Sequence, residues 1–200
     1  MNNKNKPSQE LLATSADVVT KVLEVPLFDT IGLSYILKAK SALHSIRDIY
    51  FYNKISRFIE GLEYQSAEDH AHLELVNPIE DQLSRKKIGE AVFSWIENAD
   101  STTKIDYYAV IFSAFRKGEI DQVQMRFFGH IINKAFLDDL ENFISEYSKY
   151  GYIASGSFAN STLKDLAWIE GENTLPHMGH LNYALLPESE LLFKMLADFK

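Results

Sequence analysis

The sequence predicts a mainly α-helical protein, a helical bundle followed by a small mixed α/β C-terminal element. Up to about residue 150, apolar residues recur at intervals of three and four, which is the spacing of one helix face. Beyond that point the chain becomes rich in glycine and serine, and "HLNYALL" (180–186) favours a strand. With 46% hydrophobic residues in a chain of 200, one ordinary core can form. We expect a flexible tail at 1–7, an α-helical core domain at 8–150 and a C-terminal α/β appendage at 151–200.

The N-terminal part is predicted to form two helices. The first covers about 8–23, with a serine as its N-cap. After Pro26, a long helical stretch is expected over about 29–62, with a break near Tyr52–Asn53 as an alternative. The apolar segment 25–37 is shorter than the roughly 20 residues that a membrane span needs, and it contains Asp29. We therefore expect no transmembrane segment.

Capping signals divide the rest of the core. Ser66, with Asp69 three residues later, resembles a capping box at the start of a short helix. Further helices are expected over about 79–99, from Thr103, and over about 122–147, because each stretch has an apolar stripe of helical spacing. Five or six helices are the simplest interpretation.

The C-terminal element is expected to mix both structure types. A short helix is predicted around 163–169, before the strand at 180–186. Pro187 then favours a helix start, and Glu188 and Glu190 in the first turn suit the positive end of the helix dipole.

The stretch "RKGEID" has the G-x-I-D spacing of an EF-hand calcium loop. If Gly118 were position six of that loop, positions three and five would be Phe115 and Lys117, and Gln124 would close it. Phenylalanine cannot bind calcium, lysine repels it, and glutamine is a poor closing ligand. The sequence instead predicts a structural joint, in which Gly118 ends one helix as a left-handed C-cap and Asp121 caps the next.

No other motif nominates catalytic or cofactor chemistry. The candidate metal ligands are His177 and His180 in "PHMGH", but no third ligand is recognisable. His44 and His130 lie in helical stretches and are read as packed or hydrogen-bonded. The chain has no nucleophile elbow, P-loop or dinucleotide fingerprint. We therefore expect a non-enzymatic protein with no catalytic residue and no cofactor.

Charge and aromatic content point to a protein partner or to self-association. The formal charge of −8 repels nucleic acid, and the cluster "SRKK" (84–87), taken as a solvated helix start rather than an anion site, does not change this. Tyr50, Phe51 and Tyr52 are consecutive, so on a helix they cannot all face one interior, and they are the candidate interaction residues. Peripheral membrane association through 25–37 is an alternative. The absence of cysteine and of a signal peptide favours a cytoplasmic location.

A family resemblance covers roughly residues 24–148. The stretches "RDIYFYNKISRFIEGL", "IENADSTTK" and "IFSAFRKGEI" follow the patterns "rd-x-x-f-x-x-K-x-x-x-F-l", "ieradd-x-x-K" and "lfkayl-x-G-x-I". They resemble an uncharacterised bacterial family often encoded in prophage or phage-defence neighbourhoods. The resemblance implies a bacterial or phage-related origin and a role in phage resistance or superinfection exclusion.

The same resemblance bears on the C-terminal end. Members often finish in a winged-helix-like element with the pattern "y-x-l-T-x-x-G", and here the matching stretch is "NYALLPESE", with Pro187 and no threonine–glycine pair. The winged-helix-like end of such proteins implies an alternative function for this chain, that of a nucleic-acid-binding regulator. The charge of residues 151–200 opposes it, because they contain three lysines and no arginine and are outnumbered by acidic residues.

Overall fold

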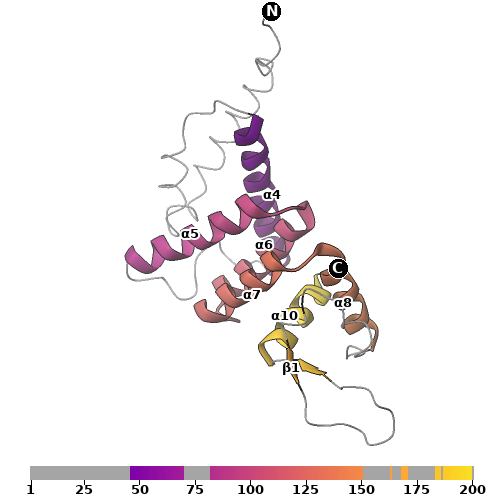
Figure 1. The fold of residues 1–200 in the computed structure, drawn as a ribbon. Coiled ribbons are helices and arrows are strands. Elements are labelled where there is room, and N and C mark those ends of the chain that lie inside the picture. Colours follow the sequence, from indigo (N-terminus) through magenta and orange to yellow (C-terminus); the bar gives the residue numbers. More distant parts are fainter. Residues whose placement is uncertain are drawn as a thin grey trace, which may run out of the picture.

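The structure is a computed structural model that describes residues 46–69, 82–150, 163, 168–170, 183–185 and 187–199. Within these residues lie six helices and one two-stranded sheet (Figure 1). The prediction of a mainly α-helical protein is confirmed. The tail at 1–7, the helix at 8–23 and the segment 25–37 lie outside the described residues. The elements are α4 (Ile46–Asp69), α5 (Gln82–Asn98), α6 (Thr102–Lys117), α7 (Gln122–Lys134), α8 (Leu137–Tyr150), β1 (Trp168–Glu170), β2 (Tyr183–Leu185) and α10 (Pro187–Asp198).

Helix α4 is one continuous helix of 24 residues. The alternative of a break near Tyr52–Asn53 is wrong, because α4 continues through both residues. The capping box predicted at Ser66 is also wrong, because Ser66 and Asp69 both lie inside α4. No proline interrupts the chain between residues 46 and 69, so the preceding turns continue past the local S-x-x-D pattern. Its buried face follows helical spacing: Phe51, Tyr52, Ile55, Phe58, Ile59 and Leu62.

Helix α6 is the centre of the bundle and packs against α4, α5, α7 and α10. Every residue from Tyr107 to Ala114 is buried, as expected for a helix surrounded by others. The approach of α4 is closest at Gly61, where an added Cβ would come within 2.8 Å of the Ala109 Cβ. The missing side chain of Gly61 therefore allows the short distance between α4 and α6.

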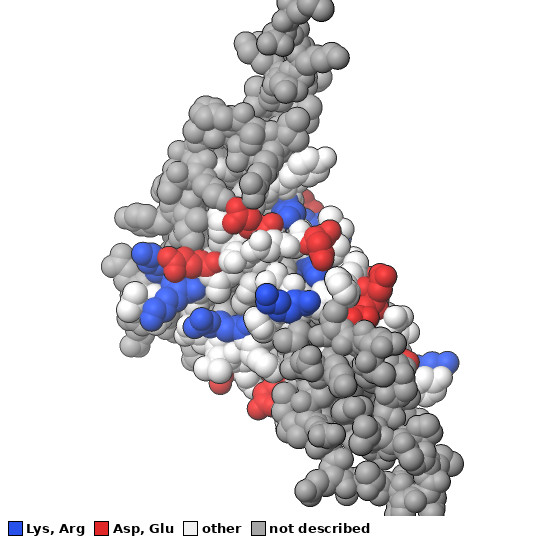
Figure 2. All heavy atoms as spheres, in the orientation of Figure 1, with Lys and Arg blue, Asp and Glu red and all other residues white. Residues whose placement is uncertain are grey.

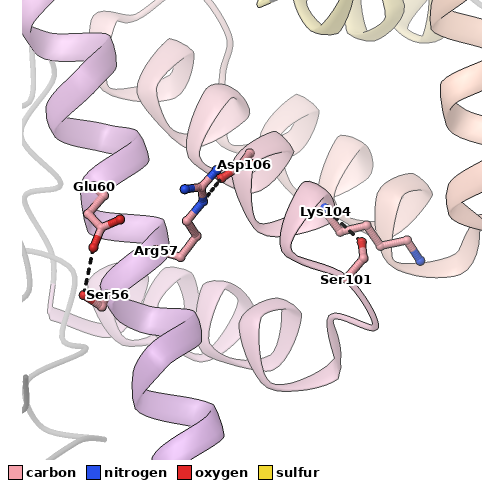
Figure 3. Close-up of polar contacts among 6 residues, drawn as sticks. All are labelled: Ser56, Arg57, Glu60, Ser101, Lys104 and Asp106. Carbon is pink, nitrogen blue, oxygen red and sulfur yellow. Dashed lines mark hydrogen bonds and ion pairs between the residues drawn. The ribbon is translucent and has the colours of Figure 1, made fainter. Parts of the chain in front are cut away.

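An ion pair joins the same two helices at the surface. The Arg57 guanidinium on α4 donates to both carboxylate oxygens of Asp106 on α6, at 2.7 and 2.9 Å (Figure 3). This hydrogen bond, with the charge of Asp106, raises the pKa of Arg57 above its ordinary value. The bidentate geometry adds a specific contact between the two helices at their exposed edge.

The joint between α6 and α7 has the caps that the sequence predicts. Gly118 ends α6 in the left-handed conformation, with φ 75° and ψ 14°. The Asp121 side chain accepts from the Gln124 N–H at 2.8 Å, and the Gln124 side chain accepts from the Asp121 N–H at 2.9 Å. This reciprocal capping box engages the Asp121 carboxylate in starting α7.

The single helix predicted over 122–147 is wrong, because the structure has two helices there. Ala135 adopts an extended conformation, with ψ 148°, and separates α7 from α8. Lys104 on α6 explains the interruption: its ammonium donates to the Ala135 carbonyl at 2.7 Å and pairs with Asp100 at 3.0 Å. Apolar spacing alone does not show such a contact, since Lys104 lies 31 residues away in sequence.

The C-terminal residues pack onto the same core. Helix α10 lies beside α8, where the Phe143 and Phe193 rings are 5.4 Å apart, and it also contacts α6 (Figure 1). The buried residues of α10 belong to the hydrophobic core that the other helices share. The predicted boundary near residue 150 therefore does not separate two hydrophobic cores.

Two strands precede α10. Strands β1 and β2 pair antiparallel, with Ile169 opposite Ala184. The strand predicted over 180–186 is confirmed at Tyr183–Leu185, and Pro187 begins α10 as predicted. The helix predicted around 163–169 is wrong at its end, because Trp168 and Ile169 lie in β1. Pairing with β2 satisfies the backbone hydrogen bonds there, which local propensity does not reveal.

Candidate functional site

The structure separates the three consecutive aromatic residues. Tyr50 is 67% exposed, whereas Phe51 and Tyr52 are buried, and the Phe51 ring packs 4.8 Å from that of Phe93 on α5. The predicted interaction role therefore stays with Tyr50 alone. His177 and His180 lie outside the described residues. Among the described residues, no group of three or more acidic or histidine side chains could hold a metal ion.

A groove between α5 and α7 is the candidate site. It has a volume of about 670 Å³. Ala91 and Trp95 line it from α5. Helix α7 contributes the other wall with Gln122, Val123, Arg126, Phe127 and His130. Both walls are rigid helices, so the shape of the groove is largely set before anything binds.

Trp95 positions the two walls. Its ring stacks on Tyr108 of α6, with centroids 5.7 Å apart and an interplanar angle of 24°. On α7, Gly129 faces the same ring, and a Cβ at that position would penetrate the indole. The indole therefore lies between α6 and a glycine of α7, while it also lines the groove. Only glycine at position 129 permits this approach.

The lining of the groove combines apolar and cationic side chains. The inward stripe of α7, which includes Met125, Phe128 and Ile132, is buried in the core. The residues of α7 that are not part of this stripe lie outside the core. Val123 is 75% exposed and lies four residues before Phe127, so the two form an apolar strip on one face. Arg126 and His130, both exposed, are spaced in the same way beside it.

His130 corrects one expectation. The sequence suggested a packed or hydrogen-bonded histidine, but its side chain is exposed on the groove wall. Phe127, with only part of its surface buried, supplies the apolar neighbour. Helical spacing correctly predicted which residues of α7 face the core. It did not show that Val123 and Phe127 form a strip on the outward face.

The charges of α5 and α7 differ in sign from the chain as a whole. Helix α7 contains Arg126 and Lys134 and no acidic residue between its first and last positions. On α5, Arg85, Lys86 and Lys87 form a basic cluster, and Lys86 lies 3.8 Å from Glu90. Figure 2 shows several Lys and Arg side chains close together on the face where α5 and α7 lie. In a chain of net charge −8, this face is locally basic.

Two lysines fix the ends of the groove helices. Lys54 on α4 donates to the carbonyls of Glu97 and Ala99, at 3.0 and 2.6 Å, where α5 ends. Lys104 on α6 donates to the Ala135 carbonyl, where α7 ends. Cations favour helix C-termini because the last carbonyls lack partners within the helix. Burial lowers the pKa of Lys54 below its ordinary value, and nearby carboxylates oppose this shift.

These lysines also lie in the stretches of sequence that suggest the family resemblance. The "K" of "f-x-x-K" is Lys54, and the "K" of "add-x-x-K" is Lys104. Both act as positioning residues between helices, since their ammonium groups bind backbone carbonyls. The matched glycine, Gly118, ends α6. Lys54, Lys104 and Gly118 thus act at helix ends.

The groove lining combines apolar, amide and cationic side chains. Among the described residues that line it, Arg126 and His130 are the ionisable ones, and neither is paired with a nucleophile or an acid within that lining. Tyr108 lies under Trp95 with a buried hydroxyl, and burial together with Asp100 raises its pKa well above the ordinary value. Such a phenol stays neutral and structural. The groove can hold an apolar side chain next to an anionic group.

The described part of the chain is mainly helical and has a groove lined by apolar and cationic side chains. No known protein family, curated protein or solved structure matches the chain. Within the described part of the chain, none of the helices has the length and apolar character needed to cross a membrane.

Proposed function

We propose that the chain is a non-enzymatic interaction protein that docks a protein partner in the groove between α5 and α7. The observation that supports this most is the exposure of Val123, next to Phe127 and Arg126, on a rigid wall. Burying an exposed apolar strip on docking releases water and is favourable. An arginine beside the strip adds orientation through a charge-assisted hydrogen bond. Phenylalanine and arginine, the residue types at positions 127 and 126, are enriched in protein interfaces.

The biological setting follows from the family resemblance. Relatedness to prophage and phage-defence neighbourhoods supports a bacterial protein that acts in phage resistance or superinfection exclusion. In that setting, an interaction protein would act by binding a host or phage protein and changing its availability. This setting rests on the gene neighbourhoods of the family and not on a binding site. The partner must therefore be identified from the site itself.

The test is a quantitative pull-down from the bacterial host during phage infection. The bait is the full chain, compared with Val123→Glu and Arg126→Glu, which alter the groove without touching the core. The matched control is Leu83→Ser, since Leu83 is an apolar residue on α5 that is 60% exposed and lies outside the groove lining. A partner retained by the wild type and the control should fall by about tenfold or more with each groove variant. Equal recovery by all four baits would contradict docking at this groove.

A nucleic-acid-binding regulator is the second candidate. The observation in its favour is that the C-terminal end combines an antiparallel β1–β2 pair with α10, a helix anchored on the core, which are the element types of a winged-helix-like end. The charge of α10 weakens this candidate function. The helix carries three acidic residues, Glu188, Glu190 and Asp198, and one basic residue, Lys194. An electrophoretic shift assay at low salt, where nonspecific binding is strongest, tests this reading. A shift that survives competitor nucleic acid would favour it over protein docking.

A further inference from the structure

Phe136 is an exposed aromatic side chain in the bend between α7 and α8. It is 66% exposed, although Ala135 beside it is buried. The first turn of α8 follows immediately and carries Asp138 and Asp139. Asp138 and Glu141 are both exposed. The bend therefore presents an aromatic ring next to a cluster of negative charges, which we call the Phe136 corner.

We infer that the partner of the groove is a second copy of this chain, which inserts its Phe136 corner; this inference rests on the proposed function of the groove. The two surfaces are complementary in kind. The groove offers the apolar pair Val123 and Phe127 beside the cationic Arg126, and the corner offers an aromatic ring beside the anionic Asp138. Matching an apolar anchor and opposite charges gives both affinity and register.

A Phe136 side chain that fills the groove must come from another molecule. The groove residues of α7 lie between Gln122 and His130, and Phe136 follows the end of the same helix. A helix rises about 1.5 Å per residue, so Phe136 lies roughly 20 Å along the axis from Val123. A rigid helix cannot bring its own end back to its beginning. Phe136 therefore cannot occupy the groove of its own chain.

A two-fold arrangement satisfies both surfaces at once. If two α7 helices run antiparallel across the symmetry axis, the Phe136 corner of each copy meets the groove of the other. Such an isologous contact closes on itself and uses both surfaces of each copy. It also pairs the basic face of α5 and α7 with an acidic region, in a chain whose net charge of −8 otherwise opposes self-association.

The experiment is sedimentation velocity of the full chain over a wide concentration range, with single and mixed variants. Val123→Glu disables the groove, and Phe136→Ser disables the corner. Both side chains are largely exposed, so each variant should keep the wild-type circular dichroism and melting curve. We expect each variant to weaken dimerisation by about tenfold or more. The control Leu83→Ser should dimerise as the wild type does.

The mixture of the two variants gives the sharpest result. Val123→Glu retains an intact corner and Phe136→Ser retains an intact groove, so mixing them should restore one of the two contacts. We expect more association in the mixture than in either variant alone. A wild-type monomer at all concentrations, a dimer that ignores both substitutions, or a mixture no better than its parts would each overturn the inference.

The two proposals fail separately. If the chain is a monomer but Val123→Glu still removes a captured protein, self-association is wrong and the groove docks a different partner. If the dimer depends on Val123 and Phe136 but no captured protein depends on Val123, self-association stands and docking of a host or phage protein is wrong. If the wild type and both variants behave alike in both assays, the groove binds no protein.

Discussion

The α4–α6 pair and the α5–α7 pair both depend on a glycine inside a helix, and they use it differently. In the first pair Gly61 faces Ala109, a small side chain, and the helices close against each other. In the second pair Gly129 faces the large ring of Trp95, which is buried and also lines a groove. The glycine opposite alanine thus lets two helices pack closely. The glycine opposite tryptophan instead makes room for an aromatic ring at the base of a groove.

The first pair also holds the second in place. Lys54 extends from α4 to the end of α5, and Lys104 extends from α6 to the end of α7. Each lysine binds carbonyls that a helix end leaves without partners. The groove between α5 and α7 is therefore built on two fixed ends, and its geometry depends on residues that do not line it.

The largest expected effect comes from replacing Gly129 by alanine. The new Cβ would overlap the Trp95 ring, which is fixed on its other side by Tyr108 and cannot move away. Alanine gains about 1 kcal/mol of helix propensity over glycine, which offsets part of the overpacking. We expect Gly129→Ala to lower the free energy of unfolding by about 3 kcal/mol, towards the upper end of overpacking effects. Denaturant unfolding measures it.

Gly61→Ala is the matched control for that prediction. The same methyl group meets the Ala109 Cβ at 2.8 Å instead of an aromatic ring, so a small shift of α4 relieves the contact. Propensity offsets most of the loss, and we expect a net change of about 1 kcal/mol or less. Equal losses at positions 61 and 129 would show that Trp95 does not distinguish the two interfaces.

An intermediate effect is expected at the lysines. Lys104 is 2% exposed, so Lys104→Met leaves the Ala135 carbonyl buried without its donor, which should cost about 2 kcal/mol. Lys54 is less buried, so water can replace its ammonium in Lys54→Met, and we expect about half that loss. The free energies of unfolding of both variants, measured side by side, check the order. A larger loss at Lys54 would contradict this account of the two helix ends.

Local signals in the sequence were enough for most of the helices. The joint at Gly118 and Asp121 is predictable because both caps lie within a few residues of the backbone groups that they satisfy. The break before α8 is not, because its cause is Lys104, which is close in space and distant in sequence. Strand β1 escaped prediction for the same reason, since its partner β2 lies many residues further along the chain.

Of the two walls of the candidate groove, only the one formed by α7 could be predicted from the sequence. Periodicity identifies the inward face of α7, and the remaining apolar residues, Val123 and Phe127, are then left over at a spacing of four. That remainder, with Arg126 and no acidic residue in the helix, was a usable signal. The opposite wall was not predictable, because Trp95 reads as an ordinary core residue until Gly129 is known to face it.

The smallest effect is expected at the Arg57–Asp106 ion pair, which closes the α4–α6 pair at the surface. Its geometry is bidentate, but the Arg57 side chain is 51% exposed, so solvent weakens the attraction. A double-mutant cycle with Arg57→Met and Asp106→Asn should give a coupling of about 0.5 kcal/mol that decreases in 1 M salt, as for other exposed pairs. A coupling above about 2 kcal/mol, unchanged by salt, would be typical of a buried pair. The α4–α6 interface would then depend on this ion pair rather than on the fit of Gly61 against Ala109.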